Sequence, residues 1–490
     1  MTRGTVTRFT PADQRRFARQ SGDCNPIHLD ASAARRIVAG EPIVHGVHLL
    51  LRMLEAHFAV KARGRRRRRL SISITFLQPA IVGERIRFAR DAEGRLSAET
   101  VDGGATLAVA TIAPIETNAE ESLGRGFQPR RGGPDRAALH RLLRTPLVRT
   151  AADVEGAAGT IALPPAAPLA RAFPRTARAL GAEAVAAVAG LSALVGMECP
   201  GRDSLLSAIR IELTMRGRSS PLDWVVERVD RRFGLVKIAV HGAGIAGTVD
   251  TFLRPRPAAP ATIAAASARV APCDLAGVRA LVVGGSRGLG AATAMLIAAG
   301  GGRPIVTYAA GADEVAELQR DAKSAGRPID ALRLDVRARD ASRAVRAAVA
   351  RFGITQLYYF ASPRIFVRRA GPFDERLFDR FATFYVYAFA RLCTAALAAA
   401  PSLAIFYPST TAIDDVPAEL TEYATAKAAG ECVCRGIAEQ HARSLIVIRR
   451  LPRIATDQTA SILAVPALDP LDAMLPIVRE IHQRANESGA

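Results

Sequence analysis

A carboxylate and an imidazole lie close together in a turn-rich segment near the N-terminus, residues 21–28. Asn25 precedes a proline there, and a proline ring disfavours helical backbone for the residue before it, so the segment is expected to be extended. Asp23 and His28 can then converge from the two ends of one loop. Adding water to a double bond conjugated to a thioester, or removing it, requires a base and an acid. The spacing predicts such a pair; a plain turn with a surface histidine is the alternative.

The whole string Ser-Gly-Asp-x-Asn-Pro-x-His favours the acid/base interpretation. Phe17 precedes it, and Glu-Pro-Ile-Val-His-Gly follows it at residues 41–46. Together these residues resemble the hydratase motif of the MaoC-like, R-specific enoyl-CoA hydratases. Later segments at 76–79 and 82–84 are similar to a strand and turn of that family, so the resemblance covers roughly residues 5–115. It implies a hot-dog domain.

The resemblance also implies roles for four residues. Asp23 and His28 would be the catalytic pair, and Asn25 would orient them. Gly46 would begin the central helix and present a backbone N–H to the thioester oxygen. The unpaired amides of a helix N-terminus suit that task, because they point toward developing negative charge.

A second unit follows at residues 152–255. An alanine-rich helix comes first, and strand patterns follow it at 204–213, 224–229, 235–241 and 245–252. This order resembles the second half of a double hot-dog hydratase. The unit contains no Asp-x-Asn-Pro-x-His string, so we expect it to pair with the first unit without forming a second hydration centre. An unrelated α+β domain is the alternative.

A third unit begins with an apolar strand at 278–283, which runs into the turn Gly-Gly-Ser-Arg-Gly-Leu-Gly at 284–290 and then into a helix at 291–299. Glycines permit a tight turn and the close approach of a pyrophosphate to the helix N-terminus. Further strand patterns alternate with helical spans, at 304–308, 331–334, 356–360, 402–407 and 444–449. This alternation predicts a dinucleotide-binding, doubly wound parallel sheet.

Tyr423 and Lys427 lie four residues apart, so a helix places them on one face. The lysine charge can lower the pKa of the tyrosine, which can then donate a proton to a ketone that receives hydride. Ser409, at the end of the preceding strand, is our choice for the hydroxyl that binds the carbonyl oxygen, with Thr410 as the fallback. Combined with the glycine turn, the pair resembles the short-chain dehydrogenase/reductase family across roughly residues 275–465.

That resemblance implies a set of cofactor contacts. They are Gly284, Ser286, Arg287, Gly288, Leu289, Gly290, Asp335, Val336, Tyr423, Lys427, Pro452 and Thr456. The chain departs from the family pattern in several places. Val283 replaces a threonine, residues 358–362 replace Asn-Asn-Ala-Gly, Tyr385 replaces the asparagine of the proton relay, and Arg453 replaces a glycine. The serine, tyrosine and lysine remain, so an active reductase is favoured over a scaffold that binds nucleotide without turnover.

Charge near the glycine turn favours NADPH over NADH. Arg287 can bind a 2′-phosphate, and no Asp or Glu stands at 307–310, the end of the second strand, to bind a ribose diol. Asp313 and Glu314 follow shortly and would reverse this preference if the turn is tighter. No metal ion is expected.

Two chemistries on one chain indicate consecutive steps on one acyl thioester. Reduction of a 3-ketoacyl thioester by NADPH would give the (R)-3-hydroxyacyl form, and reversible dehydration would give the trans-2-enoyl form. Coenzyme A or an acyl carrier protein can be the thioester handle, and we expect a homo-oligomer. Two alternatives stay open: a hydratase whose nucleotide-binding domain is a scaffold, and a reductase domain that acts on an unrelated ketone.

The 490-residue chain has a formal net charge of +20, which favours acidic partners such as nucleic acid, coenzyme A phosphates or an acidic carrier protein. Its densest basic run, residues 65–69, is expected to be a solvated loop, with a phosphate-binding patch as the alternative. Aromatic residues do not alternate with these arginines, so base stacking is not indicated. Nucleic acid therefore ranks behind the thioester partners.

The six cysteines show neither a metal-binding Cys-x-x-Cys spacing nor a secreted disulfide pattern, and the first ten residues lack an apolar signal segment. We therefore expect a cytoplasmic protein without a membrane span. The predicted fold is multi-domain, α+β followed by α/β. The expected parts are a hot-dog hydratase domain at 1–118, a linker at 119–150, a second, degenerate hot-dog domain at 151–256, a linker at 257–273 and a Rossmann domain at 274–490.

Overall fold

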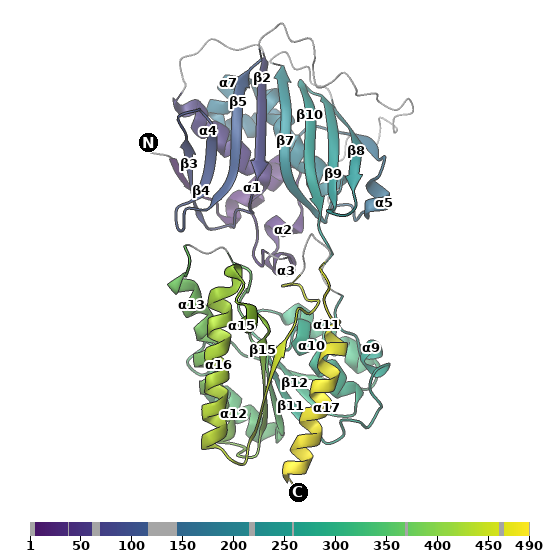
Figure 1. Cartoon of the computed structure of the whole chain (residues 1–490). Helices are drawn as coiled ribbons and strands as arrows, with labels where there is room; N and C mark the ends of the chain where they lie inside the picture. The colour runs from purple at the N-terminus through teal and green to yellow at the C-terminus, as the bar shows by residue number, and fades with distance from the viewer. Residues whose placement is uncertain are drawn as a thin grey trace. The chain divides into compact units, whose positions relative to one another are not determined.

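The computed structural model describes residues 5–37, 39–60, 69–115, 145–214, 221–256, 259–367, 371–459 and 465–489. These residues form two compact units, one that ends at Arg256 and one that follows it (Figure 1). Each unit is built on its own sheet. Most of the expected linker at 119–150 and most of the basic run at 65–69 lie outside the described residues.

The described residues of the first unit contain one antiparallel sheet of ten strands. In spatial order they are β1 (Thr5–Arg8), β3 (Arg85–Arg90), β4 (Leu96–Thr100), β5 (Thr106–Pro114), β2 (Arg69–Phe76), β7 (Ser204–Thr214), β10 (Ile245–Leu253), β9 (Leu235–Gly242), β8 (Leu222–Asp230) and β6 (Ala158–Ile161). β2 and β7 meet in the middle, where Ile72 is paired with Ile211. The sheet is therefore continuous across both halves, which confirms the expected double hot-dog fold.

Helices cover one face of this sheet (Figure 1). Along β2, Leu70, Ile72 and Ile74 are buried while the serines between them are partly exposed, so only one face is apolar. The central helices of the two halves, α4 (Gly46–Val60) and α8 (Ala182–Ala193), contact each other. The other helices described here are α1 (Pro11–Ser21), α2 (Pro26–Leu29), α3 (Ala31–Arg35), α5 (Ala151–Val154), α6 (Ala166–Ala172) and α7 (Pro174–Leu180).

The second half is organised around α8. Every residue from Val185 to Ala193 is buried, and α8 continues into a π-helical turn, η2 (Leu194–Glu198). The chain bends sharply between α7 and α8 at Gly181, which has φ +94°. Within the described parts of the chain, no single helix is long and apolar enough to cross a membrane; α7 and α8–η2 meet the length and composition criteria only as a pair, bent by 113°.

The described residues of the second unit contain a parallel sheet of six strands. In spatial order these are β13 (Asp330–Arg333), β12 (Arg303–Tyr308), β11 (Arg279–Val283), β14 (Gln356–Tyr359), β15 (Ala404–Thr410) and β16 (Leu445–Leu451). Numbered along the chain, this order is 3-2-1-4-5-6, and the predicted doubly wound, Rossmann-type sheet is thereby confirmed. The order reverses between β11 and β14, and sheets of this kind bind ligands at the carboxyl ends of the strands at that point.

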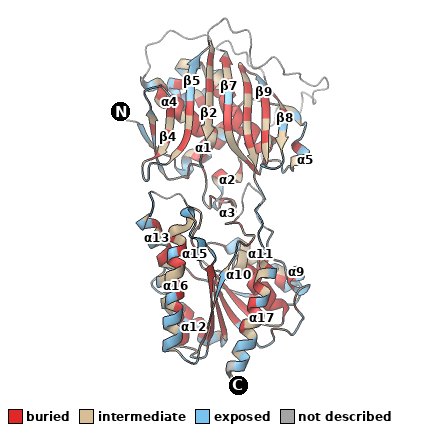
Figure 2. Cartoon of the chain, viewed as in Figure 1, coloured by how far each residue is buried: buried red, intermediate tan, exposed pale blue. Residues whose placement is uncertain are grey.

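Both faces of this sheet are buried. Along β11, Ala280 and Val282 belong to one core, whereas Leu281 and Val283 belong to the other, so the strand is apolar throughout. Figure 2 shows the buried strands between their covering helices. The helices are α9 (Ile263–Ser267), α10 (Gly288–Ala299), α11 (Ala312–Ser324), α12 (Ala341–Phe352), α13 (Glu375–Ala382), η3 (Thr383–Ala388), α14 (Phe389–Leu397), α15 (Ala412–Asp415), η4 (Ala418–Leu420), α16 (Thr421–Gln440) and α17 (Pro470–Gly489).

Candidate functional sites

The loop that carries the predicted acid/base pair lies between α1 and α2. Gly22 ends α1 with φ +82°, a left-handed conformation that glycine adopts without strain. Asn25 has a non-helical ψ of 125°, and its Oδ1 accepts the backbone N–H of Ile27 at 3.2 Å, which caps α2. The non-helical backbone expected before Pro26 is present, and it brings Asp23 and His28 to the same side of the loop.

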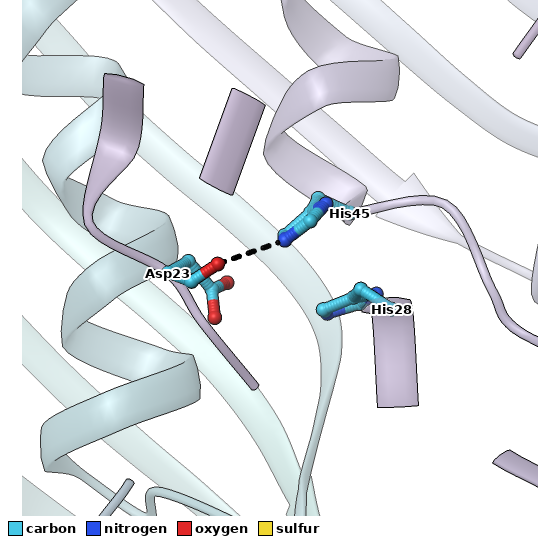
Figure 3. A group of neighbouring side chains, drawn as sticks. All are labelled: Asp23, His28 and His45. Atoms are coloured by element: carbon cyan, nitrogen blue, oxygen red, sulfur yellow. Dashed lines mark hydrogen bonds between the residues drawn. The ribbon is translucent and has the colours of Figure 1, made fainter. Parts of the chain in front are cut away.

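Asp23 and His28 are both buried, and a carboxylate oxygen of one lies within 4.8 Å of a ring nitrogen of the other (Figure 3). His28 Nδ1 lies 2.8 Å from the backbone carbonyl of Ile43, which accepts a hydrogen bond only from a protonated nitrogen. Nδ1 therefore carries the proton in the neutral ring. Nε2 carries no proton in this tautomer and can accept a proton from a ligand.

Burial shifts the proton affinities of this pair toward each other. It raises the pKa of Asp23, and the charge of His28 opposes that shift. It lowers the pKa of His28, and the charge of Asp23 opposes that shift. Burial thus makes the carboxylate a better proton acceptor and the imidazolium a better proton donor than the free side chains, which suits an acid/base pair.

A third side chain, His45, joins the pair without having been predicted. Its ring stacks on that of His28, with centroids 3.8 Å apart. One ring nitrogen lies 2.8 Å from Oε1 of Gln14, and the other lies 3.1 Å from the backbone carbonyl of Asp23. Asp23, His28 and His45 are close enough to hold a metal ion together. Since both nitrogens of His45 already contact oxygen atoms, the geometry better suits support of the Asp23 loop.

Helix α4 begins at Gly46, the residue expected to start it. Its backbone N–H belongs to the first turn, whose amides have no partner within a helix. A Cβ at this position would lie 2.8 Å from Leu206 Cδ2 and 3.3 Å from the ring of Phe76. Glycine therefore allows the start of α4 to pack closely on β2 and β7; its contact with a thioester stays a prediction.

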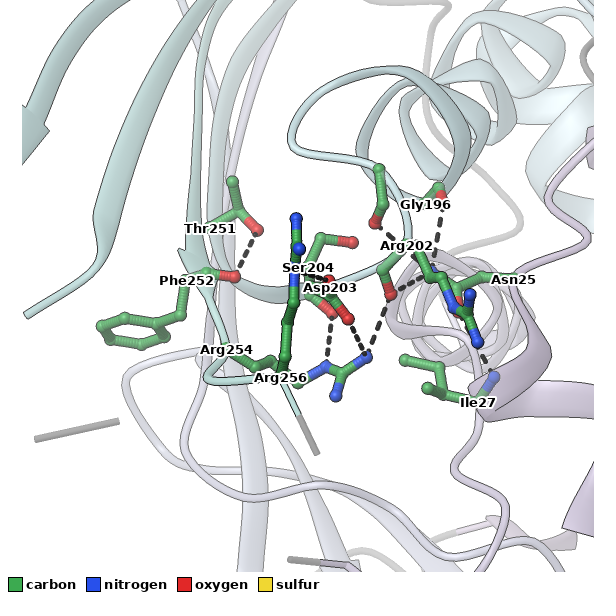
Figure 4. Close-up of polar contacts among 11 residues, drawn as sticks. Asn25, Ile27, Gly196, Arg202, Asp203, Ser204, Thr251, Phe252, Arg254 and Arg256 are labelled. Carbon is green, nitrogen blue, oxygen red and sulfur yellow. Dashed lines mark hydrogen bonds and ion pairs between the residues drawn. The ribbon is translucent and has the colours of Figure 1, made fainter. Parts of the chain in front are cut away.

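Residues of the second half touch the same loop (Figure 4). The side-chain amide of Asn25 donates to the backbone carbonyls of Gly196 and Arg202, each at 3.1 Å. The backbone N–H of Asn25 donates to Asp23 Oδ1 at 3.1 Å, and Ser192 Oγ donates to Asp23 Oδ2 at 2.6 Å. Asn25 thus links the carboxylate, the helix that carries His28, and the second half.

In the second unit, the predicted glycine turn joins β11 to α10. Gly284 and Gly288 have φ +82° and +56°, and the backbone N–H of Gly284 donates to Thr307 Oγ1 at 3.2 Å. A Cβ on Gly290 would lie 2.4 Å from the carbonyl oxygen of Gly284, so glycine permits the helix to start directly on the turn. Ser286, Arg287 and Leu289 occupy the same turn.

The segment after β16 reaches this turn. A Cβ on Gly288 would lie 3.5 Å from Thr456 Cγ2, and Arg287 forms an ion pair with Asp457 at 3.4 Å. The structure therefore brings Thr456, which follows Pro452 on this segment, to the glycine turn.

The other predicted cofactor residues, Asp335 and Val336, follow the end of β13. Val336 is buried. Arg337 binds the carboxylate of Asp335 at 2.8 Å and 3.0 Å and lowers its pKa. Their contact with adenine stays a prediction.

The structure corrects the choice of hydroxyl beside the tyrosine. Ser409 Oγ donates to the carboxylate of Glu431 at 2.6 Å, whereas the side chain of Thr410 interacts with that of Tyr423 and lowers the pKa of the tyrosine against the effect of burial. Both residues lie on β15, where neighbouring side chains point to opposite faces, so only one of them can face the tyrosine. The placement expected for Ser409 is wrong, and Thr410, the fallback, occupies it.

Lys427 lies among aromatic rings. Its Nζ is 4.2 Å from the ring centroid of Tyr385, 4.9 Å from that of Tyr407 and 6.0 Å from that of Tyr423. It donates to the backbone carbonyl of Pro408 at 2.5 Å. Burial lowers the pKa of Lys427 to about 7 and raises the pKa of Tyr423 to about 12. Burial is the largest cause of the shift of Tyr423, and the effect of the lysine charge on the tyrosine stays a prediction.

Tyr385, at the position of the relay asparagine, belongs to the π-helical turn η3. Its hydroxyl shares a 2.6 Å hydrogen bond with Ser362 Oγ, and its ring lies edge-on to that of Tyr423, with centroids 5.7 Å apart. Lys427 therefore faces an aromatic ring at this position, where the family pattern has an amide.

Comparisons with known proteins match the two units separately. Residues 2–111 match the family model of a MaoC like domain, and residues 279–459 match that of short chain dehydrogenase, which confirms both resemblances. The comparison with curated proteins found no match.

The similar solved structures include a short chain dehydrogenase from Burkholderia cenocepacia J2315 in complex with NADP, with 24% identity over 42% of this chain and 91% of that chain and a TM-score of 0.39. A 3-oxoacyl (acyl-carrier-protein) reductase from Agrobacterium tumefaciens C58 with NADP bound has 20% identity over 42% and 88%, with a TM-score of 0.38. A short-chain dehydrogenase/reductase from Serratia marcescens BCRC 10948 has 22% identity over 43% and 91%, with a TM-score of 0.39.

Proposed function

Because the chain joins a MaoC-like domain to a short-chain dehydrogenase domain, we propose that it is a bifunctional acyl-thioester enzyme. Residues 1–256 hydrate a trans-2-enoyl thioester, or dehydrate its product, with (R) specificity. Residues 274–490 reduce a 3-ketoacyl thioester with NADPH. The (R)-3-hydroxyacyl thioester is the intermediate that both reactions share.

The buried Asp23–His28 pair carries the hydration proposal. Its support is that one loop offers a carboxylate beside a ring nitrogen that is free to accept a proton, since Nδ1 of His28 donates to Ile43. In the proposed step, water bound by both groups loses a proton to His28 Nε2 and its oxygen bonds to C3. The proton then goes to C2, and the backbone N–H of Gly46 binds the thioester oxygen while negative charge develops there.

The reduction is assigned to Tyr423, Thr410 and Lys427. NADPH, when bound, supplies a hydride to the ketone carbon. Tyr423 donates its hydroxyl proton to the carbonyl oxygen, and Thr410 holds that oxygen through a hydrogen bond. The interaction of the Thr410 side chain with that of Tyr423 supports this assignment, because the two hydroxyl-bearing side chains face each other. Lys427 binds a ribose hydroxyl of the cofactor.

The residues of the glycine turn fit a dinucleotide. The turn lies at the switch in strand order, and the first amides of α10 start from it at Gly288, which suits a pyrophosphate. Arg287 supports NADPH over NADH, because its guanidinium can bind a 2′-phosphate; it is held by Asp457 at 3.4 Å, a long ion pair that a phosphate can replace.

A hydratase with a nucleotide-binding scaffold is the second candidate, and the surroundings of Lys427 favour it. An ammonium group with a pKa of about 7, covered by the ring of Tyr385, carries its charge on only part of the molecules at neutral pH. Catalysis that needs this charge would proceed only on the charged fraction, which falls as the pH rises above about 7.

The test uses the purified full chain with two substrate series. Trans-2-enoyl-CoA thioesters report hydration, and the configuration of the 3-hydroxyacyl product is measured on a chiral column. 3-Ketoacyl-CoA thioesters report reduction with NADPH or NADH. The proposal expects (R) product in the first series and faster oxidation of NADPH in the second. Hydration without cofactor oxidation at any chain length would favour the scaffold, and (S) product would contradict the assignment of the hydration site.

A further inference from the structure

Two arginines and a buried aspartate meet where β7 begins and β10 ends. Ser204 of β7 pairs with Leu253 of β10, so Asp203 lies beside the segment that carries Arg254 and Arg256. Arg254 Nη2 lies 3.6 Å from Asp203 Oδ1, and Arg256 Nε lies 3.5 Å from Asp203 Oδ2. No step of the proposed hydration uses these residues, so it does not account for their charges.

The protein holds the guanidinium group of Arg254 in place without a ligand. This side chain is only 12% exposed. Its Nε donates to the backbone carbonyl of Ser204 at 3.4 Å, and its Nη2 donates to that of Arg202 at 3.0 Å. Within the part of the chain that the structure describes, no residue accepts a hydrogen bond from Nη1 of Arg254. A fixed cation with an unused donor is thereby presented.

Positive charge exceeds negative charge at this position. Burial lowers the pKa of Arg254, the charge of Asp203 opposes that shift, and the nearby charge of Arg202 adds to it. Three guanidinium groups thus lie near one carboxylate, and we call them the arginine cluster: Arg202, Arg254 and Arg256. Both ion pairs with Asp203 are longer than the roughly 2.7–2.9 Å of strong charge-assisted hydrogen bonds. The cluster therefore keeps donors for a second anion.

The arginine cluster adjoins the loop that carries the acid/base pair (Figure 4). The carbonyl of Arg202 that accepts from Arg254 also accepts from Asn25 Nδ2, at 3.1 Å. Burial is the largest cause that lowers the pKa of His28, and the charge of Arg254 adds to that shift. An anion at the cluster would therefore lie near the hydration centre without contacting the reacting carbons.

We propose that the arginine cluster binds a phosphate group of the thioester handle, the part of the substrate that does not react. Guanidinium groups suit phosphate, because their planar set of N–H donors can bind two of its oxygens at once. Arg256 is 56% exposed, so a phosphate can reach the cluster from solvent. The proposal rests on the proposed hydration and adds the contact that holds its substrate. Coenzyme A and the phosphopantetheine of a carrier protein both carry such a phosphate.

The test compares three thioesters of one trans-2-enoyl chain in the full protein. Their handles are pantetheine, which lacks phosphate, 4′-phosphopantetheine, and coenzyme A, which adds the phosphates of its nucleotide. Arg256→Gln removes one charge at an exposed position. We expect KM for the coenzyme A thioester to rise on the order of tenfold, because a hydrogen bond to a charged group is lost. KM for the pantetheine thioester should not change, and kcat should stay within about twofold for all three.

Two variants control for the loss of an arginine as such. Arg232→Gln makes the same change at an exposed arginine of the second half that pairs with Asp230, and all three KM values should stay at those of the wild type. Arg256→Lys keeps the charge without the planar fork, and it should recover part of the lost affinity.

The middle thioester identifies the phosphate. A rise in KM that already appears with 4′-phosphopantetheine assigns the cluster to the phosphate that both handles share. A rise that appears only with coenzyme A assigns it to the phosphates of the nucleotide and favours coenzyme A as the handle.

The outcomes separate this inference from the proposed function. Unchanged KM values in Arg256→Gln, or an equal rise with all three handles, would overturn the phosphate site alone. A wild-type chain that hydrates none of the thioesters would instead overturn the proposed hydration. Binding of free coenzyme A, measured by calorimetry, then tests the cluster: Arg256→Gln should bind on the order of tenfold more weakly, and equal affinity would overturn the site.

Discussion

The two candidate sites differ in what surrounds their buried charged group. In the first unit, the carboxylate of Asp23 accepts hydrogen bonds from Ser192 and Asn25. In the second, the ammonium group of Lys427 donates to one backbone carbonyl, that of Pro408, and otherwise lies over the rings of Tyr385 and Tyr407. Hydrogen bonds stabilise an ion in place of the water that burial removes, whereas aromatic faces attract a cation and still exclude water from it. Burial alone therefore does not determine whether a catalytic group keeps its charge.

The two proposed activities are therefore expected to differ in how strongly they depend on pH. The proposed hydration relies on a carboxylate with two fixed donors and a histidine with a fixed tautomer. The proposed reduction relies on a lysine with a pKa of about 7 beside a tyrosine with a pKa of about 12. We expect the first activity to be the less sensitive of the two to pH around neutrality.

The largest expected effect is on the first site. Asp23→Asn keeps the shape of the side chain and removes its charge, so hydration should fall by about 10²–10⁴-fold, the usual contribution of a positioned acid or base. Loss of enoyl absorbance measures it. Asp91→Asn, the same change at an exposed aspartate, is the control. Hydration at the wild-type rate in Asp23→Asn would show that the pair is structural.

The matching change in the second site is Tyr423→Phe. It removes the proposed proton donor and should slow NADPH oxidation with a 3-ketoacyl thioester by about 10²–10⁴-fold, while hydration stays unchanged. Tyr387→Phe, at a side chain that is 64% exposed, serves as the control. A parallel loss of both activities would mean that the variant disturbs folding, which a thermal melt would show.

A smaller effect distinguishes the two hydroxyls of β15. Thr410→Ala should slow reduction by about tenfold to a hundredfold, since a hydrogen bond to developing charge is lost. Ser409→Ala removes a contact with Glu431 and should change the rate by less than about threefold, since the removed contact lies outside the proposed chemistry. Steady-state kinetics of reduction by the two variants decides between the two hydroxyls. A larger loss of rate in Ser409→Ala than in Thr410→Ala would restore the choice of Ser409 made from the sequence.

The smallest effect is a shift in pH dependence. The ammonium of Lys427 loses its proton as the pH rises through about 7, so reduction should decline on the alkaline side of that value. Tyr385→Asn replaces the covering ring by an amide and admits water, which favours the charged form and should move this limb up by roughly one pH unit. Tyr385→Phe keeps the ring, so the alkaline limb of its pH profile should not move. An equal shift of this limb in both variants would exclude the ring as the cause.

The sequence predicted those parts of the sites whose residues are neighbours along the chain. Asp23 and His28 lie on one short loop, and Tyr423 and Lys427 lie on one helix, so their spacing alone implies proximity. The strand–turn–helix at Gly284 was predictable for the same reason, since glycine and apolar patterns are local signals.

The remaining parts depend on packing between distant segments. Ser192 lies 169 residues from Asp23, and a serine in an alanine-rich helix carries no signal that it faces a carboxylate. The choice between Ser409 and Thr410 depends on which face of β15 meets α16, and a shift of one residue reverses it. His45 was visible only as the residue before Gly46, and its stacking on His28 follows from the entry into α4.

The central claim is that both reactions act on one acyl chain, and a coupled assay tests it most directly. The full chain is incubated with a 3-ketoacyl-CoA thioester and NADPH, and cofactor absorbance and the enoyl product are followed together, the latter by mass spectrometry. We predict that NADPH is consumed and the enoyl thioester appears, with Tyr423→Phe blocking both events and Asp23→Asn only the second. Unchanged NADPH in a preparation that still hydrates an added enoyl thioester would contradict the account and leave the second unit as a non-catalytic partner.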